Sequence, residues 1–291
     1  MYQTMLKLQT PVLFDRSKIS ISYDDRILVL GSCFADSVGA RLRNAGFDVC
    51  VNPFGVLYNP ISICNSFQRA KFGVPFSEKD CVEMGAGAGL ICSFSHHTSF
   101  ADPTAEGFLE KANKALKEAN AFVQDCNKVM ITLGTAWCYR YDQTGETVSN
   151  CLKRPAAEFT RFRLGVEATV AALSSVIKRN PDKQFIFTVS PVRHMKDGAH
   201  GNIISKSTLL MAVDELCGLF PQQVEYFPSF EIVNDELRDY RFYAEDMVHP
   251  SDVAVNYIWE RFVDFAVPAS DHARLAENEK AFRQSQHRPM H

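Results

Sequence analysis

The chain has 291 residues, 46% of them hydrophobic and 22% charged, with a formal net charge of -3 at pH 7. This length can bury a large core, and the composition is ordinary for a globular protein. The small negative charge gives no electrostatic reason to expect nucleic acid or an anionic membrane as a partner.

The nine cysteines are scattered along the chain, and no two have the C-x-x-C spacing of a zinc or thioredoxin-like site. Their odd number favours a reducing compartment. The first residues contain no uninterrupted apolar core of a signal peptide, and no apolar run has the length of a membrane span. The sequence therefore predicts a cytoplasmic protein that needs no cofactor and no metal.

The predicted elements alternate apolar strands with amphipathic helices. The predicted strands are 26–31, 47–51, 89–100, 128–134, 184–192 and 224–229. The predicted helices are 35–46, 61–73, 104–126, 160–180, 205–220 and 251–265.

Apolar strands that are separated by helices are typical of a parallel sheet covered on both faces. We therefore expect one doubly wound α/β domain over 1–291, with a core at about 11–265 and a polar tail at 269–291, frayed or helical and loose at its end. The segments 73–89 and 139–155 are expected to be loops that shape the binding pocket.

The stretch LVLGSCFADSVG, residues 28–39, places Ser32 at the carboxyl end of the first strand, just before a helix. In a parallel sheet, ligands bind in the crevice at these strand ends. A serine there can attack a carbonyl if a base takes its proton, and its own N–H can help to hold the oxyanion. The alternative is that Ser32 only caps the helix.

Asp246 and His249 lie three residues apart, directly before the last predicted helix. An aspartate can hold one imidazole nitrogen and leave the other to act as a base toward a serine. The alternative is a helix-entry loop with a surface histidine.

Three further stretches contribute candidates. Gly55 follows a strand and could present its N–H as an oxyanion donor, or it could be a simple turn. Arg193 and His194 end a buried strand at the same edge, where they could contact substrate, brace the loop that carries His249, or be solvated. The pair His96 and His97 would alternate along a strand, so at most one, His97, can face the crevice.

These stretches resemble the SGNH-type serine hydrolases, and GSCFA at residues 31–35 is similar to the motif that names the GSCFA domain family. The blocks that carry the resemblance, between Pro11 and Phe265, are VNPFGVLYNPISI, SFSHH, TLGTAW, TVSPVRHMKDG and DMVHPS. The resemblance implies a flavodoxin-like three-layer α/β/α sandwich. It also implies Ser32 as nucleophile, His249 as base, Asp246 as its orienting group and Gly55 as an oxyanion donor.

One block departs from the SGNH pattern, because Ala136 stands where those enzymes carry an oxyanion-binding asparagine. The loss of one such donor costs about 3 kcal/mol of transition-state stabilisation. The hydroxyl of Thr135, the indole of Trp137 or the side chain of Asn59 could replace it.

Neighbouring side chains in a strand-to-helix turn point in different directions, so one of Ser32 and Cys33 is expected to face the crevice and the other to pack. The resemblance implies that Ser32 faces the crevice, and Cys33 is then expected to be buried and inert. The predicted function is a Ser-His-Asp esterase, deacylase or acyltransferase that acts through an acyl-enzyme. Its expected partner is a small molecule or glycan that carries an acyl group. The alternative is a non-catalytic ligand-binding protein on a decayed hydrolase scaffold.

Overall fold

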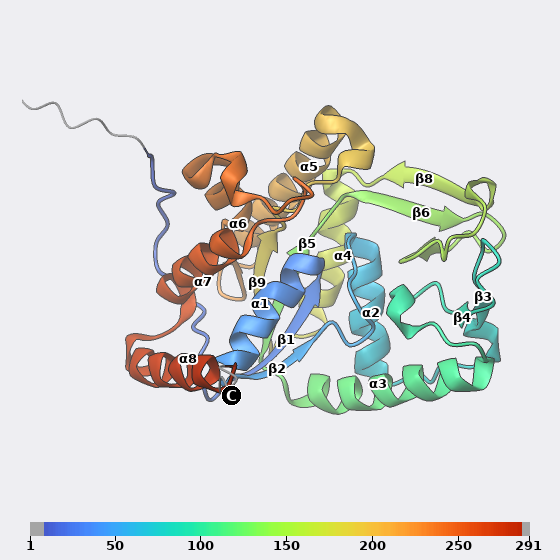
Figure 1. The fold of residues 1–291 in the computed structure, drawn as a ribbon, viewed down its shortest axis with the longest axis horizontal. Helices are drawn as coiled ribbons and strands as arrows, with labels where there is room; N and C mark the ends of the chain where they lie inside the picture. Colours follow the sequence, from blue (N-terminus) through green and yellow to red (C-terminus); the bar gives the residue numbers. More distant parts are fainter. Residues whose placement is uncertain (1–8, 287–291) are drawn as a thin grey trace, which may run out of the picture.

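The structure is a computed structural model, and it describes residues 9–286. Its centre is a five-stranded parallel sheet in the order β10-β9-β5-β1-β2 (Figure 1). The strands are β1 (Arg26–Gly31), β2 (Asp48–Val51), β5 (Lys128–Leu133), β9 (Gln184–Val189) and β10 (Val224–Tyr226). Among the described residues, no helix is long and apolar enough to cross a membrane.

Helices cover both faces of this sheet. Side chains alternate along each strand, so they enter two separate cores, one on each face. Leu28 and Leu30 of β1 lie in one core, whereas Ile27 and Val29 lie in the other. The first core takes residues from α2 (Pro60–Phe72), α3 (Ala105–Asp125), α4 (Val166–Lys178) and α5 (Gly198–Leu219). The second takes residues from α1 (Cys33–Asn44) and α7 (Asp252–Ala266). The predicted three-layer α/β/α fold is confirmed.

The prediction of a strand over 89–100 is wrong for most of its length. Only β4 (Ile91–Cys92) is extended, and it pairs with β3 (Val82–Glu83) outside the main sheet. The cause is His96, which is fully buried among the rings of four phenylalanines and turns the chain inward. Those rings belong to Phe54, Phe76, Phe100 and Phe108.

The helix predicted over 160–180 also needs correction, because its first residues form β8 (Phe159–Arg163). The alternation of FTRFR has the period of a strand, and Gly165 separates it from α4. Together with β6 (Trp137–Tyr141) and β7 (Thr147–Val148), β8 makes a three-stranded antiparallel sheet. The residues 139–141 and 147–148 of the predicted loop therefore belong to a sheet that extends beyond the parallel one (Figure 1).

The polar tail forms α8 (His272–Gln286), which packs on the body of the protein. Leu275 is buried, the Asn278 amide donates to the Ala45 carbonyl at 2.8 Å, and the Trp259 indole donates to Glu279 at 2.7 Å. Of the end predicted to be loose, residues 287–291 lie outside the described residues.

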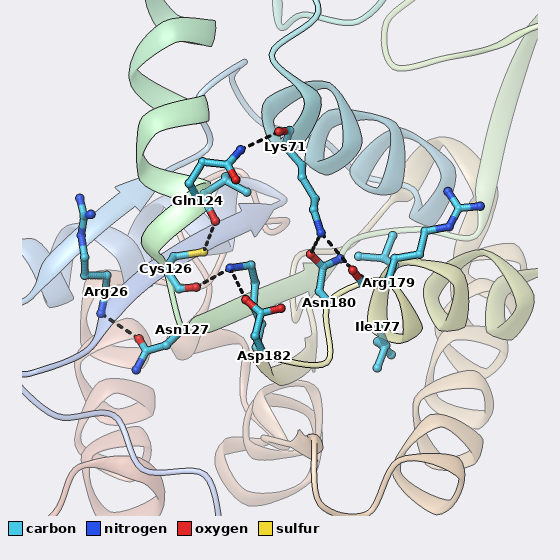
Figure 2. A network of polar contacts seen from close by, with 12 residues as sticks. Arg26, Lys71, Gln124, Cys126, Asn127, Ile177, Arg179, Asn180 and Asp182 are labelled. Atoms are coloured by element: carbon cyan, nitrogen blue, oxygen red, sulfur yellow. Dashed lines mark hydrogen bonds and ion pairs between the residues drawn. The ribbon is translucent and has the colours of Figure 1, made fainter.

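A polar network closes the amino-terminal edge of the sheet (Figure 2). The backbone N–H of Arg26 donates to the Asn127 side chain at 3.0 Å. Lys71 donates to Asn180 at 2.5 Å, and the buried Lys183 donates to the Cys126 carbonyl at 2.6 Å. These contacts satisfy backbone and side-chain groups where the strands begin and where α2 and α4 end.

We expect His96 to make the protein sensitive to acid. Burial lowers the pKa of His96 to about 3, so the folded chain resists a proton that the unfolded chain binds below about pH 6.5. The stability from the neutral ring is present above pH 6.5 and is lost as the pH falls. The loss of unfolding free energy should amount to about 2 kcal/mol between pH 7 and pH 5.

The test is urea unfolding at both pH values. Between pH 7 and pH 5, His96→Phe should lose less unfolding free energy than the wild type. The exposed His200 supplies the control His200→Ala, which should behave as the wild type, and an unchanged loss in His96→Phe would contradict this origin.

Candidate active site

The turn between β1 and α1 is held by Asn52, which follows the neighbouring strand β2. Gly31 has a φ of 138°, and its N–H donates to the side-chain oxygen of Asn52 at 2.8 Å. The amide nitrogen of Asn52 donates in turn to Asp36 in the first turn of α1 at 2.6 Å. Asn52 therefore fixes the turn from the end of β2. The sequence analysis missed this residue, although it begins the quoted NPFG loop.

Ser32 caps α1, as the alternative interpretation of this residue predicted. Its hydroxyl accepts from the N–H of Phe34 at 3.3 Å, and its own N–H donates to the Thr132 carbonyl at 3.2 Å. The residue is 1% exposed, and it packs beside Gly134. The expectation that Ser32 faces the crevice is therefore wrong, and its N–H is already engaged.

Cys33, the first residue of α1, is half-buried and lines a cavity at the carboxyl end of the sheet. Its Sγ lies 3.5 Å from the hydroxyl of Tyr58. The expectation that Cys33 is buried is wrong, because Ser32 is the residue that packs inward, beside Gly134, and Cys33 lies on the side of the cavity.

This cavity has a volume of about 390 Å³. Its apolar wall consists of Tyr58, Trp137, Tyr139, Val148, Val192, Met195 and Val248. Six of the predicted site residues line the cavity, namely Asn59, Thr135, Trp137, Arg193, His194 and His249.

His249 and Asp246 form a bonded pair at the cavity. The Nδ1 atom of His249 lies 2.6 Å from Asp246 Oδ2, and the other carboxylate oxygen accepts from the N–H groups of Val248 and His249. These hydrogen bonds, first the one from the His249 backbone, lower the pKa of Asp246 to about 2. An ionised carboxylate only accepts, so Nδ1 carries the proton and Nε2 is left with a free lone pair.

Arg193 braces the loop that carries His249. Its N–H donates to the Val248 carbonyl at 3.1 Å, and its guanidinium donates to the Met247 carbonyl at 2.9 Å. The neighbouring His194 lies edge-on to Tyr58 at 5.9 Å, and burial lowers its pKa to about 4. His194 is therefore neutral at pH 7.

Gly55 does not line the cavity. Its N–H donates to the Asn52 carbonyl at 2.8 Å within the turn, and its α-carbon faces the His97 side chain. The prediction of Gly55 as an oxyanion donor is therefore wrong, because the turn itself uses its N–H. The turn interpretation of this stretch is confirmed.

Asn59 and Thr135 meet at the cavity, because the Tyr58 carbonyl accepts from the N–H groups of both Gly134 and Thr135 at 2.9 Å. The side-chain oxygen of Asn59 caps α2 by accepting from Ser62 at 2.9 Å. Within residues 9–286 its amide nitrogen makes no hydrogen bond, so it is free to donate into the cavity.

The Thr135 hydroxyl accepts from the Trp137 N–H at 3.1 Å and lies 3.0 Å from the Ser205 hydroxyl. Ala136, which stands at the asparagine position, is fully buried, and its N–H donates to Ser205 at 2.8 Å. If Ser205 donates to Thr135, the Thr135 proton can point into the cavity.

Lys206 ties together the ends of two strands beneath the cavity. It is 1% exposed, and its Nζ donates to the carbonyls of Gly134 after β5 and Ser190 after β9, each at 2.6 Å. Burial lowers the pKa of Lys206 to about 7. The sequence analysis missed this residue, because a lysine in an amphipathic helix normally faces solvent.

Arg161 of β8 is a further lining residue that the sequence analysis missed, because it was assigned to a helix. Its guanidinium lies over the Trp137 ring, 4.2 Å from the centroid, and pairs with Asp197. The period-two pattern of FTRFR was the signal that could have placed it in a strand.

Neither His96 nor His97 lines the cavity. His97 caps a short helical turn by accepting from the Ser99 N–H at 3.2 Å, so its predicted contact with substrate is not supported. In the described part of the chain, no group of three or more His, Cys, Asp or Glu is arranged to hold a metal ion.

Comparisons with known proteins identify the family of this chain. A solved structure from Streptococcus pneumonia, described as a candidate platelet activating factor, is 13% identical with a TM-score of 0.40. The match covers 82% of this chain and 84% of that one. The search of curated proteins gives no match. The model of the GSCFA family matches residues 26–262, and the chain belongs to the GSCFA family.

Proposed function

We propose that this protein is a hydrolase of SGNH type, an esterase, deacylase or acyltransferase that works through a covalent acyl-enzyme. The observation that carries the proposal is the His249–Asp246 pair, bonded at 2.6 Å, on the same cavity as the β1–α1 turn. An imidazole that is oriented by a carboxylate beside a nucleophile-bearing turn is the arrangement that acyl transfer requires.

His249 has the role of general base and then of general acid. Asp246 holds the proton on Nδ1, so Nε2 can accept a proton from the nucleophile and later give it to the leaving group. Both side chains are about half exposed, at 45% and 49%. Substrate that covers them would exclude water and strengthen this proton transfer.

Three donors are available to hold the oxyanion. The amide nitrogen of Asn59 and the Thr135 hydroxyl line the cavity. The N–H of Cys33 belongs to the first turn of α1, where N–H groups have no partner within the helix and the positive end of the helix dipole favours negative charge. In this proposal Asn59 and Thr135 supply what the missing asparagine side chain at Ala136 would have supplied.

The lining suggests the class of substrate. Trp137 and Tyr139 offer flat apolar surfaces for an acyl chain or a sugar ring, and Arg193 adds positive charge at the same cavity, whereas Arg161 is paired with Asp197. A small molecule or glycan that carries an acyl group fits these features.

The proposal predicts a burst with p-nitrophenyl acetate. Formation of an acyl-enzyme should release about one equivalent of p-nitrophenol per chain before slower turnover, and intact-mass spectrometry should show one added acetyl group. Release at the rate of buffer alone, without an adduct, would refute the acyl-enzyme. That result would favour the alternative of a binding protein on a hydrolase scaffold, for which the buried Ala136 is the supporting observation.

A further inference from the structure

We infer that the nucleophile of this site is the thiol of Cys33, not the hydroxyl of Ser32. The inference rests on the proposed function, which it deepens by exchanging an oxygen-ester intermediate for a thioester.

The first argument is access. Cys33 lines the cavity together with His249, whereas Ser32 is 1% exposed and is not part of the lining. A substrate carbonyl in this cavity therefore meets sulfur first, and it would reach Ser32 only if the turn rearranged.

The second argument is that the Ser32 hydroxyl already has a structural role. It accepts from the Phe34 N–H as the cap of α1. The β-carbon of Ser32 packs beside Gly134, because a β-carbon added to Gly134 would lie 3.3 Å from it. Rotation of the Ser32 hydroxyl toward the cavity would leave the Phe34 N–H without its acceptor.

The third argument is the polar surroundings of the sulfur. Tyr58 places its hydroxyl 3.5 Å from Sγ, and burial raises the pKa of Tyr58, so the phenol keeps its proton and can donate to sulfur. Cys33 is also the first residue of α1, where negative charge on sulfur lies at the positive end of the helix dipole.

The other cysteines do not share this setting. Burial raises the pKa of the thiols at positions 50, 64, 81, 92, 126, 138, 151 and 217, which keeps them protonated. None of these eight residues lines the cavity that contains His249.

The chemical steps balance with an ester and water as reactants. The Cys33 proton passes to His249 Nε2, a bond forms between Sγ and the carbonyl carbon, and the bond from that carbon to the leaving oxygen breaks. His249 gives its proton to that oxygen, which leaves as an alcohol. Water then attacks the thioester while His249 takes a proton from it, the bond to sulfur breaks, and the proton returns to sulfur.

The first test identifies the acyl-bearing atom in the wild-type protein. After reaction with p-nitrophenyl acetate and a rapid quench, the acetyl group should map to Cys33 by peptide fragmentation. Neutral hydroxylamine should remove it, because thioesters react with this reagent and serine esters resist it. An adduct on Ser32 that resists hydroxylamine would overturn the inference and leave the proposed function standing.

The second test needs no substrate. Iodoacetamide at pH 7 should alkylate Cys33 at least about tenfold faster than Cys217, and His249→Ala should remove most of this difference. Cys217 is also half-buried and lies in α5 away from the cavity, so it reports the reactivity of a thiol that burial keeps protonated. The comparison of wild type with His249→Ala then isolates the contribution of His249. Alkylation of Cys33 no faster than that of Cys217 would overturn the inference, whatever the ester assay shows.

Variants separate the two neighbouring residues. Cys33→Ala should abolish the burst, and Ser32→Ala should keep it within about threefold of the wild type, with circular dichroism confirming that both are folded. If Cys33→Ala fails to fold, Cys33→Ser serves as a second variant, because it preserves the size of the side chain. Any acetyl group bound to this variant would be a serine ester and should resist hydroxylamine. Loss of the burst in folded Ser32→Ala with retention in Cys33→Ala would refute the assignment.

Discussion

Replacement of His249 by alanine is expected to lower kcat/KM for an activated ester by about a thousandfold or more. Nε2 of this ring is the free basic nitrogen that Asp246 orients from the other side, at 2.6 Å. Without it, the nucleophile and the water that later attacks the acyl-enzyme lose their proton acceptor, and such a proton transfer contributes about 10²- to 10⁴-fold. Steady-state hydrolysis of p-nitrophenyl acetate measures the effect.

Asp246→Asn should give a large loss as well, because an asparagine amide can donate to Nδ1 and trap the tautomer in which Nε2 carries the proton. The matched control is His200→Ala, which removes an exposed histidine outside the cavity and should retain full activity. Equal activity of His249→Ala and His200→Ala would exclude His249 from the reaction.

Gly31→Ala is expected to destabilise the protein by at least about 3 kcal/mol. Gly31 has a φ of 138°, a conformation that residues with a side chain rarely adopt, and an added β-carbon would lie 2.1 Å from the Thr132 carbonyl oxygen. The neighbouring strand β5 would have to move away from β1 in the middle of the sheet. Urea unfolding followed by circular dichroism should show the fall in stability.

Gly218→Ala is the matched control for this substitution. Gly218 lies near the end of α5, and an added β-carbon there would meet nothing within 4 Å. Alanine favours a helix over glycine by up to about 1 kcal/mol, so this variant should be as stable as the wild type or more stable. If the two alanine variants unfolded at the same urea concentration, the close approach of Gly31 to Thr132 would not matter for stability.

The site was predictable where it depends on neighbours in the chain. Asp246 and His249 are three residues apart, and a pair so close needs only one loop conformation to bond. The capping roles of Ser32 and Asn59 are equally local, because each accepts from an N–H two or three residues ahead. The convergence of strand ends on one edge followed from the apolar runs, since parallel strands all point the same way.

The errors arose where a distant segment decides the outcome. Whether Ser32 or Cys33 faces the cavity depends on Gly134, about one hundred residues later, which packs against Ser32 and leaves the other side open. His96 is buried among four phenylalanine rings, three of which come from outside its own stretch, so the strand pattern of that stretch does not reveal the burial. Arg161 reaches the cavity through strand pairing with β6, because its hydrogen-bonding partners lie more than twenty residues away.

The sequence by itself determined the three-layer fold, the edge of the sheet that holds the site and the bonded pair of Asp246 and His249, because periodicity and short-range hydrogen bonds specify each of these. Only the tertiary structure decided that the N–H of Gly55 is bonded within a turn and that the Cys33 thiol, not the Ser32 hydroxyl, lines the cavity. The direction of a side chain at a turn is set by what packs against it, and that packing comes from segments far away along the chain.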